Sequence, residues 1–435
     1  MAVKVSRRAF VGTAGLSLAN PRSGRSEAAA PVRIGVVGTG GRGTGLLRIA
    51  SSFPGVEFPA LCDINPQNLA RAQDLVMTSG RKKPEGYTGE EDYRRLMERS
   101  DLDGVLIATP WEWHTPMAVH SMKSGKYAAV EVPAALTVEQ CWDLVNTQEQ
   151  TRVPCMMLEN WSFRRDNLAV LNMIRGGMLG EINHCHCAHS HDCTYWYFDK
   201  EGNPRWSGNY LYKRNADQYP THSLGPVLSW MDFNCGDYPA YLTSTATRSL
   251  SLPHYFTRKF GPNHPSAKRT PLQADIVTSV AKSIKGNTLV INNDMQSPRP
   301  YDNRWEISGT EGIYNEAHSA VYIAGVSPKP DTWEPFEPYQ KKHDHFWYKE
   351  LEREAPGAVR SEVGHGAPDF LELRLFINAV RNKSATPLDI YDSVLMCAVI
   401  PLSEQSIAKG SAPVPFPDFT RGKWKTRKPH FGVQA

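Results

Sequence analysis

Histidine and cysteine residues crowd one short segment of the chain. Four histidines and three cysteines fall within residues 184–193, whose sequence is HCHCAHSHDC. Both side chains are common metal ligands, so the segment raises the question of a metal site. On an extended strand, Cys185, Cys187, His189 and His191 share one face, and a metal there would need further ligands from another element. We therefore interpret the segment as a sheet strand that binds no metal. A site that borrows ligands is the alternative.

A glycine-rich turn near the start of the chain has the spacing of a dinucleotide-binding loop. Gly38, Gly40 and Gly43 directly follow an apolar, β-branched run at residues 32–37 and precede an apolar helical pattern. Glycines at this spacing let a pyrophosphate approach the start of the helix. Asp63 ends the next apolar run, twenty residues beyond Gly43. A carboxylate there accepts hydrogen bonds from the ribose hydroxyls and repels a 2′-phosphate, so the pattern predicts NAD rather than NADP.

The elements that follow must position these groups. Apolar runs at residues 101–110, 126–133 and 153–160 alternate with helical patterns, which predicts a parallel, doubly wound sheet. Residues at the carboxyl ends of such strands face the ligand crevice. These are Trp111, Glu112, Trp113, His114, Glu131, Val132, Glu159 and Asn160.

Beyond residue 160 the pattern changes. A helix that ends at a pair of glycines is followed by alternating strands, one hairpin and a late helical region, which predicts a large, mostly antiparallel sheet. The expected class is α/β, with a Rossmann domain followed by an α+β domain. The expected divisions are a signal segment at 1–30, a Rossmann NAD-binding domain at 31–155, a substrate domain at 156–400 and a C-terminal segment at 401–435.

The charge of the chain lies at its start. The net charge is +4, and residues 1–30 carry all of it, so the remaining residues balance to zero. Because the chain beyond residue 30 has no net charge, there is no electrostatic reason to expect nucleic acid or an anionic membrane as a partner. The stretch SRRAF at residues 6–10 carries a twin-arginine pair before a short apolar run, which predicts a Tat signal and a periplasmic or secreted protein. The eight cysteines show no disulfide framework, although one or two bridges are compatible with export.

Several motifs resemble one family across nearly the whole chain. A Rossmann half joined to a mostly antiparallel half resembles the Gfo/Idh/MocA oxidoreductases, which usually carry a lysine where this chain has Val132 in VEVP. That departure, together with PWEWHTP, MMLEN, RNADQYPTHSLGP and SPRPY, resembles glycoside hydrolase family 109. The resemblance implies an NAD-dependent α-N-acetylgalactosaminidase.

The resemblance also implies site residues. For the cofactor they are Arg42, Gly43, Asp63, Trp111, Glu112, Trp113, His114, Glu131, Val132, Asn160 and Tyr219. For the sugar they are His189, Arg205, Tyr219, Pro220, Thr221, His222, Tyr301 and His365. Two positions depart from the family pattern: a family tyrosine is His189 here, and the family's Trp-Arg pair has no clean match, because Ser207 aligns and Arg205 lies two residues away.

The chemistry that the resemblance implies is redox-neutral. NAD⁺ takes a hydride from sugar C3, the resulting ketone acidifies the C2 proton, the group at C1 leaves, water adds, and the hydride returns. His222 would be the base at C3, since imidazole titrates nearest neutral pH. His189 would be the base at C2, Tyr219 and Tyr301 would orient the sugar or relay protons, and Glu159 would polarise a neighbour or bind water.

Two other functions stay open from the sequence. One is a periplasmic NAD-dependent sugar dehydrogenase, against which the missing lysine at Val132 counts. The other is a sugar-binding protein with a structural NAD, against which Tyr219, His222 and Tyr301 count together. The sequence leaves the sugar, its anomer and any homo-oligomer undetermined.

Overall fold

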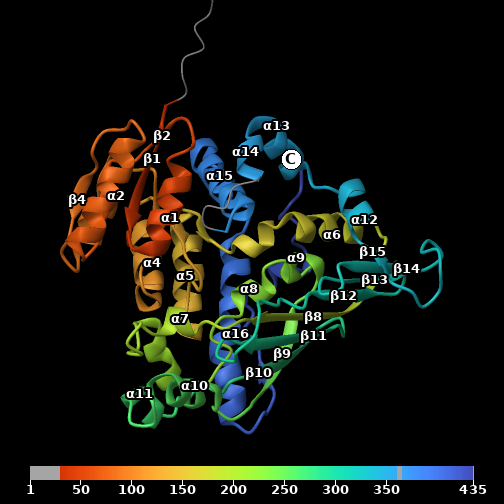
Figure 1. The fold of residues 1–435 in the computed structure, drawn as a ribbon. Coiled ribbons are helices and arrows are strands. Elements are labelled where there is room, and N and C mark those ends of the chain that lie inside the picture. The colour runs from red at the N-terminus through yellow and green to blue at the C-terminus, as the bar shows by residue number, and fades with distance from the viewer. Residues whose placement is uncertain (1–29, 360–364, 435) are drawn as a thin grey trace, which may run out of the picture.

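The computed structural model describes residues 30–359 and 365–434. The predicted twin-arginine segment lies outside these residues. The described chain forms two sheets with helices around them, and a long helix passes from one half to the other (Figure 1). The predicted class, a Rossmann half followed by a half with a mostly antiparallel sheet, is confirmed.

The first sheet is parallel throughout. Its strand order is β4-β3-β1-β5-β6-β7, with the short strand β2 beside β1. Because β1 has β3 on one side and β5 on the other, the order reverses at β1, which is where such sheets bind ligands. The strands are β1 Val32–Val37, β2 Val56–Glu57, β3 Ala60–Cys62, β4 Glu85–Tyr87, β5 Gly104–Ile107, β6 Tyr127–Val130 and β7 Cys155–Met157.

Helices connect these strands. Their apolar faces pack on the sheet, whose central strands are buried on both sides, as expected for a parallel sheet. They are α1 Gly41–Ala50, α2 Pro66–Thr78, α3 Asp92–Met97, the 3-10 turn η1 Trp111–Trp113, α4 His114–Lys123 and α5 Val138–Thr151.

The second sheet is mixed. Its order is β15-β14-β13-β12-β8-β11-β10-β9-β16, with β8 and β11 parallel and every other pair antiparallel. The predicted hairpin is β10 with β11. The strands are β8 Ile182–Ser190, β9 Pro239–Ala246, β10 Val277–Ser283, β11 Thr288–Asp294, β12 Glu306–Gly309, β13 Gly312–Asn315, β14 Ala320–Ile323, β15 Glu334–Pro335 and β16 Val414–Pro415.

The helices of the second half are mostly short. Those that frame the site are η2 Asn160–Phe163, α6 Arg165–Arg175, α8 Thr221–Leu224, α15 Ala367–Asn382 and α16 Ile390–Ala408. The others are α7 Thr194–Tyr197, η3 Ser207–Tyr212, α9 Val227–Trp230, α10 Ser251–Phe260, α11 Pro265–Lys268, α12 Glu337–Lys342, α13 Phe346–Glu354, α14 Pro356–Val359 and η4 Lys423–Lys425.

Two late helices join the halves. Helix α15 packs on α1 of the Rossmann half, and α16 contacts both α5 and β9 (Figure 1). Helix α16 runs through residue 400, and β16 pairs with β9. The segment after residue 400 therefore contributes to the second sheet. Among the described residues, no helix is both long and apolar enough to cross a bilayer.

The His/Cys segment forms the predicted strand, β8. Cys185 and Cys187 are buried on one face, while His184 and His186 on the other face bond to Thr288 Oγ1 at 2.8 Å and to Asn292 Oδ1 at 2.7 Å. The strand ends at Ser190, so strict alternation does not extend to His191. All eight cysteines lie in the described residues and are free thiols, so the bridges considered from the sequence are absent.

Candidate active site

The glycine turn closes tightly on its neighbours. Gly38 has φ +83°, and a Cβ there would lie 2.6 Å from the carbonyl oxygen of Ala108. A Cβ on Gly43 would lie 1.8 Å from the Gly38 carbonyl oxygen. Only glycine fits either position, because the first needs a left-handed conformation and both need close approach. Helix α1 then starts with no acidic residue in its first turn, which leaves its positive end free for an anion.

Asp63 is fixed against this turn. Its Oδ2 accepts a hydrogen bond from the Thr39 amide at 2.7 Å, and its Oδ1 accepts one from the Asn65 amide at 2.8 Å. The side chain is 8% exposed. The neighbouring Ile64 is 69% exposed. The predicted ribose carboxylate thus stands at the carboxyl end of β3, with an exposed apolar residue next to it.

A buried carboxylate links three residues that the sequence predicts for the site. Asp369, in the first turn of α15, contacts the Arg42 guanidinium and accepts hydrogen bonds from Asn160 Nδ2 at 2.8 Å and the His365 amide at 2.9 Å. Arg42 Nε also donates to Glu131 Oε1 at 2.5 Å. Burial opposes ionisation of Asp369, but the His365 hydrogen bond and the Arg42 charge hold its pKa well below the usual range. Asp369 is therefore an anion that orders the cofactor side of the site.

Asn160 contributes to this network a polar atom that has no hydrogen-bond partner in the described residues. Asn160 is fully buried, its Nδ2 is bonded to Asp369, and its Oδ1 has no partner. Glu372, one helical turn after Asp369, is also fully buried, and burial together with Asp369 raises its pKa well above the ordinary value. An unpaired buried amide oxygen is costly unless a ligand satisfies it. Asn160 is therefore oriented to accept a hydrogen bond from a bound molecule.

Rings from four separate elements meet beside this network. We call His189, Tyr219, His222, Tyr301 and Trp161 the ring cluster. His189, at the end of β8, has its ring centroid 5.1 Å from Tyr219, 5.1 Å from His222 and 5.6 Å from Tyr301. Trp161 of η2 lies 5.7 Å from His222 and 6.0 Å from Tyr301. The predicted catalytic residues, which are far apart in the sequence, are thus brought together.

His222 and Glu159 form a buried pair. His222 Nδ1 lies 2.9 Å from Glu159 Oε2 and 3.0 Å from Oε1, and Glu159 is fully buried. Burial raises the pKa of Glu159 to about 8 and lowers the pKa of His222 well below its ordinary value. Both shifts have the same cause, because burial disfavours the charged form of each group. The remaining nitrogen of His222, Nε2, is the one left to exchange a proton with a ligand.

His189 is a neutral imidazole with an unused nitrogen. It is 2% exposed, its Nδ1 has no partner among the described residues, and burial with the nearby histidines lowers its pKa well below the ordinary value. His191 Nε2 lies 3.0 Å from Cys193 Sγ, and ligand atoms of His189, His191 and Cys193 all lie within 4.8 Å of one another. The nearest approach to a metal-ligand set on this segment therefore uses Cys193 rather than Cys185 and Cys187.

Trp111 forms the base of an aromatic wall. It is buried and stacks on Tyr219 with ring centroids 5.8 Å apart. The wall continues through Trp196, Trp206 and Tyr210, whose centroids lie 5.6, 5.7 and 5.0 Å from that of Trp111. Such a surface is typical of sites that cover the apolar face of a sugar or nucleotide.

The other residues of η1 and its loop differ in their surroundings. Glu112 accepts a hydrogen bond from the Tyr210 hydroxyl at 2.7 Å, and Trp113 is 36% exposed. His114 is buried between two backbone carbonyls, those of Pro133 and Thr109, each 2.8 Å from a ring nitrogen. The ring of His114 is therefore occupied in joining the ends of β5 and β6.

The remaining predicted residues divide into buried and exposed ones. Val132 is buried at the carboxyl end of β6, and Pro220 and Thr221 are buried at the start of α8. His365 is partly exposed, with its ring centroid 5.4 Å from Trp161. Arg205 is exposed, and its Nε donates to the Phe198 carbonyl at 3.1 Å. Arg205 thus makes no contact with the ring cluster among the described residues.

Sequence reasoning missed several residues of the site. Asp369 and Trp161 are central to it, and Trp196 and Trp206 build the wall. Signals existed for two of them. Trp161 directly follows Asn160 near a strand end, and Asp369 stands only four residues after His365, at the start of a helix. Trp196 and Trp206 carried no positional signal.

Comparisons with known proteins show which family and fold the chain resembles. Residues 163–426 match the model for the C-terminal domain of glycosyl hydrolase 109, and residues 32–159 match the oxidoreductase family with an NAD-binding Rossmann fold. A glycosyl hydrolase family 109 protein of Shewanella pealeana is 39% identical, with 98% of this chain and 99% of the relative covered. An α-N-acetylgalactosaminidase of Tannerella forsythia is 39% identical, with 92% and 89% covered. Levoglucosan dehydrogenase in complex with NADH shares the fold, with a TM-score of 0.64, 19% identity, and 89% and 99% covered.

Proposed function

The chain belongs to glycoside hydrolase family 109, and on that premise we propose that it hydrolyses terminal α-N-acetylgalactosaminides with the help of a bound NAD. One relative is named as such an enzyme. The observation that carries the proposal is the arrangement of two imidazoles, His222 backed by Glu159 and His189 with an unpartnered nitrogen, with ring centroids 5.1 Å apart. A reaction that removes one proton from the C3 hydroxyl and another from C2 needs two such bases.

The residues around the glycine turn fit NAD. The open start of α1 suits the pyrophosphate, Asp63 suits the ribose, and Asn160 Oδ1 is an unused buried acceptor. Arg42, ordered by Glu131 and Asp369, lies in the turn itself. When bound, NAD supplies a reversible hydride acceptor for sugar C3. Val132 stands where related dehydrogenases carry a lysine, so proton transfer falls to the ring cluster.

His222 removes the proton of the C3 hydroxyl. It does so through Nε2, because Nδ1 faces Glu159. The Glu159 carboxylate then stabilises the imidazolium, as the acid of a catalytic triad does. Ionised Glu159 is the competent form, since its carboxylate must accept a hydrogen bond from Nδ1–H so that Nε2 carries no proton and can act as the base.

His189 removes the proton at C2. Its depressed pKa keeps it neutral, and its Nδ1 has no competing partner in the described residues. Burial raises the pKa values of Tyr219 and Tyr301, so both tyrosines keep their protons at neutral pH. They are therefore hydrogen-bond donors to the sugar and to the oxygen that leaves from C1, rather than bases.

The test is hydrolysis of a nitrophenyl α-N-acetylgalactosaminide by the protein as purified, in D₂O and without added NAD. We expect nitrophenol release, deuterium at C2 of the sugar, and about one NAD per chain on denaturation. Asp63→Ala should lose the NAD, and recovery of NADP would contradict the Asp63 assignment. Accumulation of free NADH would indicate a dehydrogenase instead, and hydrolysis without label at C2 would indicate direct displacement.

We also propose that the protein is exported in its folded form. The support is the twin-arginine pair of Arg7 and Arg8 before a short apolar run. A cofactor that never leaves the enzyme suits export, because it is loaded before the protein crosses the membrane.

A further inference from the structure

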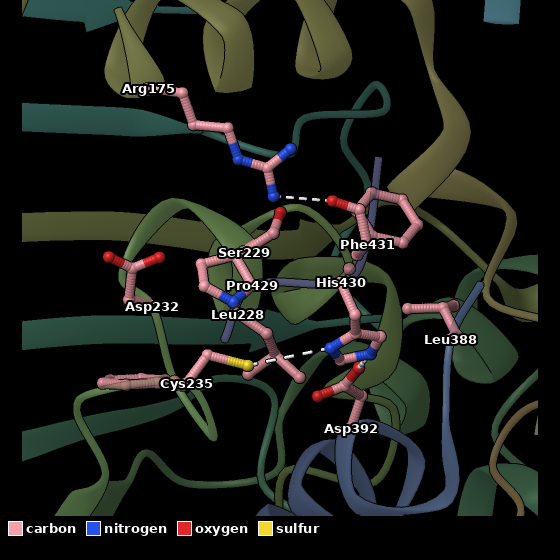
Figure 2. A pocket seen from close by; sticks show the side chains of 12 residues that line it. Arg175, Leu228, Ser229, Asp232, Cys235, Leu388, Asp392, Pro429, His430 and Phe431 are labelled. Carbon is pink, nitrogen blue, oxygen red and sulfur yellow. Dashed lines mark hydrogen bonds and ion pairs between the residues drawn. The ribbon is translucent and has the colours of Figure 1, made fainter. Parts of the chain in front are cut away.

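A pocket lies outside the ring cluster and shares no residue with it. It is formed by the end of α6, the loop between α9 and β9, the start of α16 and the C-terminal segment (Figure 2). Its walls include apolar side chains such as Leu228, Leu388 and Phe431, and its polar groups include Cys235 and His430. Nothing in the glycosidase chemistry uses these residues.

Cys235, His430 and Asp392 lie in a row in this pocket, each next to the following one. Cys235 Sγ lies 3.7 Å from His430 Nδ1, and His430 Nε2 lies 3.0 Å from Asp392 Oδ2 (Figure 2). The other oxygen of Asp392 accepts a hydrogen bond from Asn234 Nδ2 at 2.9 Å. Asp392 therefore holds both His430 and the residue that precedes Cys235. A thiol, an imidazole and a carboxylate in this order form the arrangement that activates cysteine nucleophiles.

Positively charged groups lie near the sulfur. Arg175 lines the pocket, and Arg427 contacts Asp389, so two guanidinium groups accompany His430. Burial opposes the charge on His430, but Asp392 and Cys235 outweigh it and raise the pKa of His430 to about 11. The negative groups facing it are Asp389 and Asp392, while Asp232 lies on the pocket wall.

The same charges argue against a metal ion. Ligand atoms of Asp389, Asp392 and His430 lie within 4.8 Å of one another. However, Arg427 already neutralises Asp389, and the two acids hold His430 in its protonated form. A metal would need neutral imidazole and would face an adjacent guanidinium.

Cys235 is also the accessible cysteine. The other seven cysteines, all in the described residues, are buried, and burial raises the pKa of each. Cys235 alone of the eight is half-buried. Thiols that are buried in apolar surroundings stay protonated and unreactive, whereas a partly exposed thiol beside cations reacts.

We propose that Cys235, His430 and Asp392 form a reactive thiol site that undergoes exchange with low-molecular-weight disulfides. The Cys235 thiolate attacks one sulfur of the disulfide, a new S–S bond forms to Cys235, and the original S–S bond breaks. The departing thiolate leaves to solvent, where it takes a proton from water, and His430 keeps its own proton beside Asp392. The products are a mixed disulfide on Cys235 and one small thiol, so no other oxidant or reductant is needed.

The test measures thiol release from dithiodipyridine, a small disulfide, by the intact protein at several pH values. An ordinary thiol reacts about a hundred-fold more slowly at pH 6 than at pH 8, because its pKa is about 8.5. We expect one fast-reacting thiol per chain whose rate falls less than about tenfold over this range. A wild-type rate that follows the ordinary profile would overturn the proposal.

Two variants test which side chains cause the fast thiol reaction. Cys235→Ser should lose the fast reaction and the mass increase that glutathione disulfide produces, with glycosidase activity unchanged. His430→Gln should restore the ordinary, roughly hundred-fold pH dependence of a free thiol. His254→Gln, at an exposed histidine on α10, is the matched control and should behave as wild type. A fast reaction that persists in Cys235→Ser would assign it to another cysteine and overturn the proposal.

Discussion

Asp369 and Arg42 are in contact although 327 positions separate them in the chain. The contact ties the first turn of α15 to the glycine turn of the Rossmann half. Arg42 is also bonded to Glu131, so the guanidinium is held from both halves of the protein. The orientation of the cofactor loop therefore depends on a helix that belongs to the second half of the chain.

Replacing Asp369 should release the cofactor. Asp369→Asn keeps the shape but removes one of the buried counter-charges of Arg42, and breaking a buried pair costs about 3–5 kcal/mol. We expect the purified variant to carry several-fold less NAD than wild type, measured after denaturation. Asp143→Asn, at an exposed position on α5, is the control and should keep its NAD. Full NAD content in Asp369→Asn would show that Arg42 needs no such support.

Activity should rise with pH up to about 8. The raised pKa of Glu159, about 8, means that the carboxyl is protonated below that value and ionised above it. Because His222 needs an ionised Glu159 to act as a base, kcat/KM should increase through this range and then level off. In Glu159→Gln this rise of kcat/KM with pH should disappear, along with most of the activity. If kcat/KM of that variant still rises with pH as in wild type, the rise belongs to another titrating group.

His189→Ala should separate the two proton transfers. Without the base at C2, the variant should still reduce its bound NAD⁺ when substrate is added, seen as NADH absorbance, yet release no nitrophenol and exchange no deuterium. His222→Ala should fail earlier, with no NADH signal. Equal loss of both signals in His189→Ala would mean that His189 holds the substrate instead of removing a proton.

Chelators should leave hydrolysis intact. His189, His191 and Cys193 carry the ligand atoms that lie nearest to one another on this segment. Burial lowers the pKa values of His189 and His191 and raises the pKa of the Cys193 thiol, so the thiol stays protonated. We expect dialysis against EDTA to change activity by less than about twofold, and elemental analysis to find less than one metal per chain. Stoichiometric zinc or copper would instead make His189, His191 and Cys193 a metal site.

Export should depend on the arginine pair. Changing both Arg7 and Arg8 to lysine preserves the charge but removes the signature, so the protein should accumulate in the cytoplasmic fraction. Cell fractionation followed by activity measurement in each compartment tests this. An unchanged periplasmic yield would assign another role to the segment.

Local patterns predicted much of the fold and part of the site. The glycine turn, Asp63 and the β8 strand each follow from residues that are neighbours in sequence, and so does the β10–β11 hairpin. Residue types that match a motif also identified Tyr219, His222 and Tyr301, and the aligned position identified His189, where the family has a tyrosine. Their surroundings within the fold were not needed to recognise them.

Other features depend on packing that no local pattern encodes. The role of Asp369 arises because α15 returns to α1, and Trp196 and Trp206 join Trp111 only through the course of their loop. Cys193 approaches His191 because β8 ends at Ser190 and the chain turns there, which breaks the alternation assumed from the sequence. The free state of all eight cysteines likewise follows from where each one is buried.

The last residues of the chain complete elements that are made much earlier. Strand β16 covers the edge of β9, and Arg175 at the end of α6 donates hydrogen bonds to the carbonyls of Phe431 and Gly432 at 2.6 and 2.9 Å. During synthesis, the open edge of β9 and the Arg175 guanidinium must wait until residues 414–432 have left the ribosome. The second half therefore matures only after these residues emerge, and a chain that stops before them would present an unpaired strand edge to chaperones and proteases.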